Sequence, residues 1–270
     1  MYKIDKNNNI HKHSFHLVNP SPWPILISFS SLVLTSGLVL FFHKFERGFT
    51  MAIIGLILVL VVMFSWFRDI IREGVFEGAH TTSVQEGLKL GMILFILTEA
   101  LFFLSFFWGF FHSSLNPVVD IGCTWPPFGI TPLNPWKIPF LNTLILLTSG
   151  ATLTYSHYAL RSGLKQDAII GLAITITLAA IFTGFQYYEY VNAPFSISDG
   201  IYGSIFYMLT GFHGFHVIIG TIFLSVCLYR LNADHFSKEH HLGFEFAAWY
   251  WHFVDVVWIL LFLIVYFWTA

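Results

Sequence analysis

The chain has 270 residues, of which 56% are hydrophobic, 19% aromatic and only 10% charged. A soluble domain carries about 25% charged residues, so this chain has too little polar surface to cover a water-soluble globule. Its formal net charge of −2 supplies no basic surface for nucleic acid. The composition therefore favours an integral membrane protein and excludes a nucleic-acid-binding one.

Seven apolar segments are long enough to cross a bilayer, which takes about 20 apolar residues in a helix. Their apolar runs are continuous rather than alternating, and this pattern is typical of helices rather than of barrel strands. We therefore predict an all-α membrane protein with seven transmembrane helices. The segments cover residues 22–42, 50–67, 85–111, 138–160, 166–190, 202–230 and 243–268.

The connections are short except for residues 112–137, which contain five prolines and cannot be helical throughout. We expect this loop to form an ordered cap at the membrane surface. Cys123 and Cys227 lie in no zinc-binding spacing, and the predicted topology separates them by most of a bilayer. We therefore expect no zinc site built on cysteine and no disulfide. No signal peptide or Arg-rich transit peptide is evident.

The distribution of lysine and arginine predicts the orientation of the chain, because basic residues are enriched in cytoplasmic or matrix loops. Ten of the 13 basic residues fall on the side of the N-terminus, and only Lys44, Arg47 and Lys137 fall on the other. The N-terminus should face the inner side. An odd number of helices then places the C-terminus outside.

Glu99 is the most conspicuous polar residue inside a predicted helix. It lies ten residues after Lys89, about 15 Å along the helix axis and near the bilayer midplane. Burial at that depth disfavours the charged carboxylate, so we expect a neutral acid. Two interpretations stay open with equal weight: a carboxyl that relays or couples protons, and one that makes a single interhelical hydrogen bond.

Two further polar pairs lie inside predicted helices, and each pair shares a helix face. They are His213 with His216, and His252 with Asp255. A haem or copper site would need imidazoles that converge from facing helices. Because intramembrane polar groups commonly bond helices to one another, we favour interhelical hydrogen bonding.

Seven histidines are expected at the inner surface, where they could buffer or relay protons, although ordinary solvated side chains are the simpler interpretation. Basic groups in the inner loops could hold anionic lipid headgroups, or the sequence WFRDIIRE could be a self-paired turn. No nucleotide-binding or nucleophile-elbow motif is present. The seven histidines are His11, His13, His16, His80, His235, His240 and His241.

Long blocks of the sequence, in order along nearly the whole chain, resemble subunit III of cytochrome c oxidase. The chain is more similar to the mitochondrial form of this subunit than to a bacterial one. The blocks include HLVNPSPWP (16–24), WFRDIIREGVFEGAHT (66–81), GMILFILTEALFFLSFFW (91–108), TGFHGFHVIIGT (210–221) and GFEFAAWYWHFVDVVW (243–258).

The resemblance implies an N-terminal arm and helix pair, residues 1–67, and a five-helix bundle, residues 68–270, separated by a lipid-filled cleft within one membrane domain. It implies that this chain has no catalytic centre and no metal or cofactor of its own, since haem a, haem a3 and copper belong to partner subunits. Glu99 matches the family's reactive intramembrane carboxylate. The expected contacts to structural phospholipids are Trp66, Arg72, Glu73, His80, Phe95, Arg230, His235 and His240.

The function implied by the resemblance is that of a non-redox core subunit in a complex that transfers electrons from cytochrome c to oxygen and pumps protons. The expected partners are subunit I as the main contact, subunit II, small accessory subunits, membrane lipids and respiratory supercomplexes. The expected location is the mitochondrial inner membrane, with the N-terminus in the matrix and the C-terminus in the intermembrane space. Two alternatives are an independent proton-coupled transporter that uses Glu99, His213 and Asp255, and subunit III of a quinol oxidase.

Overall fold

The computed structural model describes residues 14–269, and these residues form helices and connecting loops without strands. Seven of the described helices are long and apolar enough to cross a membrane, which confirms the predicted all-α membrane fold. His11 and His13, expected at the inner surface, lie outside the described residues. The helices are α1 (Trp23–Phe42), α2 (Gly48–Val75), α3 (Thr82–Leu115), α4 (Ile138–Ser162), α5 (Lys165–Asn192), α6 (Gly200–Asn232) and α7 (Leu242–Leu261).

The observed helices agree with the predicted segments, but α2 continues well past the predicted end at residue 67. Hydropathy detects only the part of a helix that suits lipid, whereas the backbone can continue through polar turns. In this extension Arg68 forms an ion pair with Asp69 at 2.9 Å. The helix ends before Gly78, whose φ of +60° departs from helical geometry. At the other end of the chain, α7 continues as a π-helix, Phe262–Phe267.

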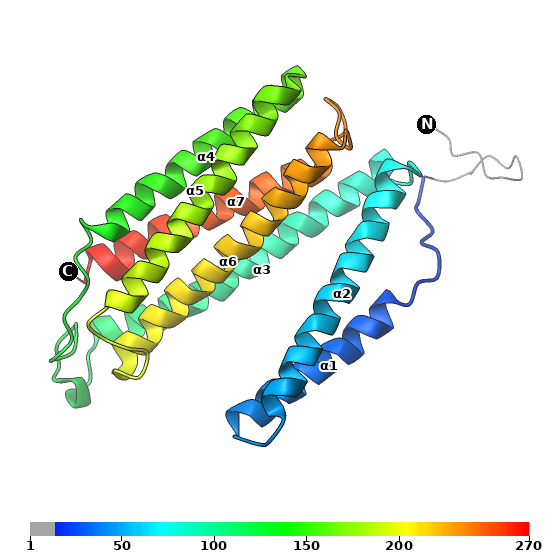
Figure 1. The fold of residues 1–270 in the computed structure, drawn as a ribbon. Coiled ribbons are helices and arrows are strands. Elements are labelled where there is room, and N and C mark those ends of the chain that lie inside the picture. Colours follow the sequence, from blue (N-terminus) through cyan, green and yellow to red (C-terminus); the bar gives the residue numbers. More distant parts are fainter. Residues whose placement is uncertain (1–13, 270) are drawn as a thin grey trace, which may run out of the picture. The chain divides into compact units, whose positions relative to one another are not determined.

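The chain forms two units, one ending at Leu88 and the other beginning at Lys89. In the first unit α1 and α2 form an antiparallel hairpin (Figure 1). Glycines bring the two backbones together, since a Cβ added at Gly37 would lie 2.4 Å from the backbone nitrogen of Ala52. A Cβ at Gly55 would lie equally close to the backbone nitrogen of Leu34. The predicted division of one membrane domain into two parts after residue 67 stays a prediction.

The second unit packs α4, α5, α6 and α7 as neighbours, with α7 the most deeply buried helix (Figure 1). Trp251 and Trp258 on α7 are fully buried. Their indole N–H groups donate to Ser149 Oγ and Thr143 Oγ1 of α4, at 3.0 and 2.9 Å. These bonds satisfy polar groups that would be costly to leave unpaired in an apolar interior.

Aromatic side chains connect α3 to the same unit. Phe102 meets Phe212 of α6 edge to face at 4.8 Å between ring centroids, and Phe103 meets Phe253 of α7 at 6.2 Å. Large rings therefore fill the space between α3 and its neighbours, and Glu99 lies on this helix within one turn of both phenylalanines.

The proline-rich loop after α3 packs against α3 and α6, and its place at the membrane surface stays a prediction. It contains a short 3-10 turn, Val119–Ile121. Trp125 lies edge to face on Phe110 of α3 and also contacts Tyr202 of α6, with ring centroids 5.5 and 5.4 Å apart. The two cysteines are both free, with Cys123 exposed in this loop and Cys227 buried in α6.

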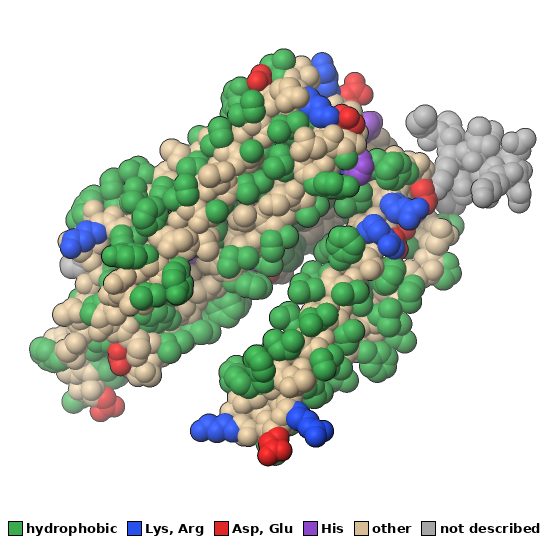
Figure 2. Space-filling model, in the orientation of Figure 1, with side chains coloured by type: hydrophobic (Ala, Val, Ile, Leu, Met, Phe, Trp, Pro, Cys, Tyr) green, Lys and Arg blue, Asp and Glu red, His purple; other side chains and the backbone are tan. Residues whose placement is uncertain are grey.

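The outer surface fits a membrane protein. Hydrophobic side chains cover the sides of the helices, whereas Lys, Arg, Asp and Glu gather at the helix ends in this view (Figure 2). Such a surface would be costly in water but suits the hydrocarbon core of a bilayer, with the charges at the polar interface.

Candidate functional site

Glu99 faces a histidine of another helix. Its Oε2 lies 2.9 Å from Nε2 of His216, so the contact joins α3 to α6. The His216 side chain is 9% exposed and that of Glu99 is 24% exposed. Phe103 and Tyr250 place their rings beside the imidazole. The pair is therefore largely surrounded by apolar and aromatic groups.

The hydrogen bonds of His216 determine how many protons this pair holds. Its Nδ1 lies 2.7 Å from the carbonyl oxygen of Phe212, which can only accept, so Nδ1 carries a hydrogen. In a neutral imidazole Nε2 is then an acceptor, and Glu99 must be protonated to donate to it. If Glu99 is ionised, His216 must carry the second proton. The contact thus holds one proton between the two side chains.

The structure shows that Glu99 makes an interhelical hydrogen bond, which was one of its two expected roles. Sequence reasoning named Glu99 and His216 separately but did not pair them, because they are 117 positions apart. A role for Glu99 in proton movement stays a prediction.

The other intramembrane histidines also bond neighbouring helices. Nε2 of His213 lies 3.2 Å from the carbonyl oxygen of Val254 on α7. Nδ1 of His252 lies 3.4 Å from Asp255 Oδ2, and its Nε2 lies 3.5 Å from Thr154 Oγ1 of α4. The interhelical hydrogen bonding favoured from the sequence is thus present for His213 and His252, whereas Asp255 pairs with His252 within α7.

The expected lipid contacts of the first unit lie at the end of α2 and in the turn after it. Arg72 is exposed, while Trp66 and Glu73 are partly buried. The ring of His80 lies over Gly74, where an added Cβ would be 2.7 Å from Nδ1. Contacts to phospholipid by these residues stay a prediction.

The expected lipid contacts of the second unit fall into two groups. Arg230 lies at the end of α6, with its guanidinium 4.3 Å from the ring centroid of Phe236, and His235 and His240 follow in the loop to α7. Phe95 is on α3, where it stacks with Tyr250 at 6.2 Å. The structure brings the first group together at the end of α6 and in the loop that follows, and leaves Phe95 on a separate helix. Lipid binding by either group stays a prediction.

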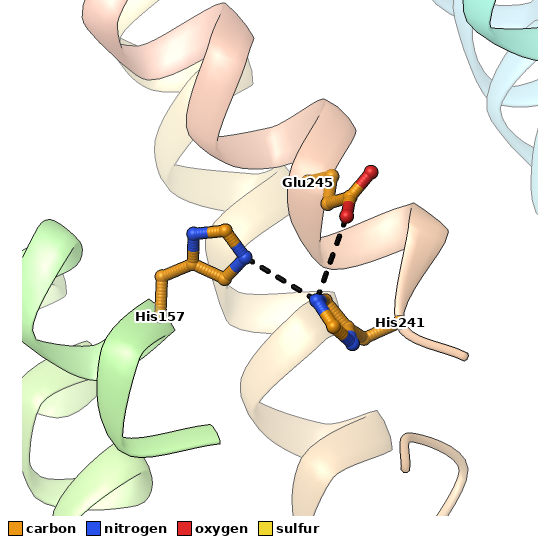
Figure 3. A group of neighbouring side chains, drawn as sticks. All are labelled: His157, His241 and Glu245. Carbon is orange, nitrogen blue, oxygen red and sulfur yellow. Dashed lines mark hydrogen bonds and ion pairs between the residues drawn. The ribbon is translucent and has the colours of Figure 1, made fainter. Parts of the chain in front are cut away.

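A polar cluster near the start of α7 was not predicted as a site. His157 of α4, His241 just before α7 and Glu245 in the first turn of α7 point toward one another (Figure 3). The Nε2 atoms of the two histidines are 3.3 Å apart, and Nε2 of His241 lies 3.5 Å from Glu245 Oε1. The four-residue spacing of His241 and Glu245 at the start of α7 was a usable signal, whereas nothing in the sequence pointed to His157.

A second buried network was also missed. Glu189 of α5 is 3% exposed, and the hydroxyl of Tyr266 donates to its Oε1 at 2.6 Å. Gln186 contacts both side chains at 3.5 Å. Tyr266 lies in the π-helix after α7, so the network joins α5 to the C-terminal end of the bundle.

Comparison with known proteins identifies the family. The family model for cytochrome c oxidase subunit III matches residues 13–270. The chain belongs to this family. A cytochrome c oxidase subunit 3 from Prototheca wickerhamii is 61% identical over 95% of this chain and 98% of the relative. Those from Marchantia polymorpha and Arabidopsis thaliana are 60% and 57% identical, each over 95% of this chain and 97% of the relative.

Membership in the subunit III family confirms the resemblance found in the sequence. It makes the chain a subunit of cytochrome c oxidase, an oxidoreductase complex of the respiratory chain, and implies assembly with other oxidase subunits. The seven membrane-length helices agree with a multi-pass membrane subunit.

Proposed function

We propose that this chain is a non-redox core subunit that stabilises subunit I, binds structural phospholipids and supports proton uptake by the oxidase. Its main contact would be subunit I, with subunit II and small accessory subunits as further neighbours. The complex transfers electrons from cytochrome c to oxygen and couples this reaction to proton pumping. Membership in the subunit III family supports this role.

In this proposal haem a, haem a3 and copper are held by partner subunits, and the chain contains no catalytic centre. Supporting this, His213 and His216 use ring nitrogens to bond a backbone carbonyl and a carboxyl of neighbouring helices. These nitrogens contribute to helix packing, which is the role expected of polar groups between membrane helices.

The chain would lie in the mitochondrial inner membrane with its N-terminus in the matrix and its C-terminus in the intermembrane space. The distribution of lysine and arginine supports this orientation. Arg230 at the end of α6 and His235 and His240 in the loop after it would then face the matrix, as would Arg72. A basic loop on that side suits anionic phospholipid headgroups.

The observation that carries the proposed role in proton uptake is the contact between Glu99 and His216, which holds one proton inside the membrane. Its test compares two substitutions in the assembled oxidase. Glu99→Gln keeps an amide N–H that can donate to His216 but removes the titratable proton. Glu99→Leu removes both the proton and the hydrogen bond. We expect both variants to lower the number of protons pumped per electron or to shorten the catalytic lifetime of the enzyme.

The matched control is Glu86→Gln, which removes an exposed carboxylate from the same helix and should leave both measurements unchanged. If only Glu99→Leu has an effect, the pair serves packing rather than proton uptake. If pumping, catalytic lifetime and phospholipid content are unchanged in both Glu99 variants, the proposal for Glu99 is wrong.

Lipid binding is tested by Arg230→Gln, with phospholipid in the purified complex measured by mass spectrometry. Loss of the guanidinium should lower the content of tightly held anionic phospholipid. Lys137→Gln removes a basic residue from the opposite predicted side and serves as the control. Equal lipid content in the two variants and the wild type would contradict the assignment of Arg230.

A further inference from the structure

The cluster of His157, His241 and Glu245 brings three metal-ligating side chains together from two helices. One ligand atom of each residue lies within 4.8 Å of the other two (Figure 3). Two of the separations are 3.3 and 3.5 Å. Ligands bound tetrahedrally to zinc at about 2.0–2.1 Å are about 3.3–3.4 Å from one another. Two of the three separations thus match the spacing of a tetrahedral site, and the third, between His157 and Glu245, lies within 4.8 Å.

The hydrogen bonding of His241 leaves its Nε2 available as a ligand. Nδ1 of this residue lies 3.0 Å from the carbonyl oxygen of Ser237, so Nδ1 carries the hydrogen of the neutral ring. Nε2 then presents a lone pair toward the other two side chains. A ring N–H bonded to a backbone carbonyl is the usual arrangement that orients a metal-bound histidine and fixes its tautomer.

A cation at the centre of the cluster would bond all three groups at once, which a single proton does not. A neutral His241 and an ionised Glu245 would place two acceptor atoms 3.5 Å apart with no hydrogen between them. A single proton on His241 can be donated well to only one neighbour at a time. A divalent cation accepts a lone pair from all three residues at once and offsets the carboxylate charge.

We propose that His157, His241 and Glu245 form a binding site for a divalent transition-metal ion, with Zn²⁺ as the best match. Two imidazole nitrogens and one carboxylate oxygen form a ligand set that suits zinc, and the fourth position is left to water. This site departs from the expectation that the chain holds no metal. It goes beyond the proposed function, since no step of electron transfer or proton uptake depends on it.

The surroundings of the site permit entry of an ion and hold its ligands. The His241 side chain is 6% exposed, whereas Glu245 is 26% exposed, so the cluster is open on the side of the carboxylate. The other carboxylate oxygen of Glu245 lies 4.0 Å from Nζ of Lys89 on α3. A bound ion would connect α4 directly to the start of α7, and Lys89 would link α3 to the same carboxylate.

The experiment uses the purified oxidase complex that contains this chain. Wild type, Glu245→Gln and Glu239→Gln complexes are treated with a chelator, equilibrated with Zn²⁺, freed of unbound ions by gel filtration and analysed by plasma mass spectrometry. Glu239 is exposed in the loop before α7, so its substitution removes the same charge from the same end of the chain. We expect the wild-type and Glu239→Gln complexes each to hold one more zinc ion than the Glu245→Gln complex.

Equal zinc content in all three complexes overturns the proposal and means that the cluster binds only a proton. If Glu245→Gln fails to assemble, His157→Gln replaces it and His112→Gln becomes the control, since His112 lies on α3 outside the cluster. A loss of one zinc ion in His157→Gln alone supports the site, whereas no loss overturns it. Comparing variants of one complex removes the contribution of metals in other subunits.

Discussion

The α1–α2 hairpin and the α4–α7 bundle hold their helices together by different contacts. In the hairpin, Gly37 and Gly55 allow one backbone to lie directly against the other. In the bundle, buried rings fill the space, and indole N–H groups such as that of Trp251 bond across helices. Lipid removes most of the hydrophobic drive between helices, so association depends on close van der Waals packing and hydrogen bonds. The two regions use these means in different proportions, since the hairpin also has an indole hydrogen bond, from Trp23 to Asp69 at 2.9 Å.

Removing a buried ring from the bundle should have the largest effect on stability. Trp251→Ala deletes a fully buried indole and its bond to Ser149, and a large-to-small change of this kind costs about 3–5 kcal/mol in free energy of unfolding. The measurement is unfolding of this chain in the purified complex with increasing sodium dodecyl sulfate. Trp108→Ala, at an exposed ring of α3, should change the midpoint much less, and equal effects would contradict the importance of the buried ring.

Adding a large side chain at a glycine of the hairpin should destabilise the packing of α1 against α2. Gly55→Leu places a Cβ against the backbone of Leu34, and overpacking of this kind costs about 3 kcal/mol, at the upper end of the usual range. The same detergent titration measures it. Gly184→Leu is the control, because a Cβ at Gly184 has no atom within 4 Å in the described structure. If Gly55→Leu and Gly184→Leu change the midpoint of the titration equally, the hairpin does not depend on close packing at its glycines.

Removing one buried hydroxyl from the bundle should have a smaller effect on stability. Tyr266→Phe removes the donor to the buried carboxyl of Glu189 without changing the ring, and an unsatisfied buried acceptor costs about 1–3 kcal/mol. Thermal unfolding of the complex measures the change. Tyr187→Phe, at an exposed residue of α5, provides the reference. No difference between the two variants would show that Gln186 alone satisfies the carboxyl.

The smallest effect should come from one interhelical hydrogen bond. Thr143→Val keeps the shape of the side chain but removes the acceptor for the indole of Trp258. We expect a cost of about 1 kcal/mol, the lower end of the range for an unpaired buried group, because hydrogen bonds between membrane helices are weak. Thermal unfolding of the complex is compared with that of Thr177→Val, since Thr177 is exposed and bonds only within α5. A loss as large as that of Trp251→Ala would mean that hydrogen bonds, rather than rings, hold the bundle.

The residues of the candidate sites differ in how clearly the sequence alone pointed to them. Glu99 was evident from the sequence because an acid within a long apolar run is costly to place in lipid. Its partner His216 was not evident, since the rotation and packing of α3 and α6 bring the two together. His157 gave no signal at all, because a single histidine near a helix end is ordinary until His241 and Glu245 are placed beside it.

The sequence by itself determined the membrane character, the number of long helices and their centres, because the length and hydropathy of a segment are local properties matched to bilayer thickness. It did not determine the polar extension of α2, since helix propensity continues where hydropathy falls. Only the tertiary structure decided which polar groups meet. The proton shared by Glu99 and His216 and the three-ligand cluster both depend on helices that are close in space and distant in sequence.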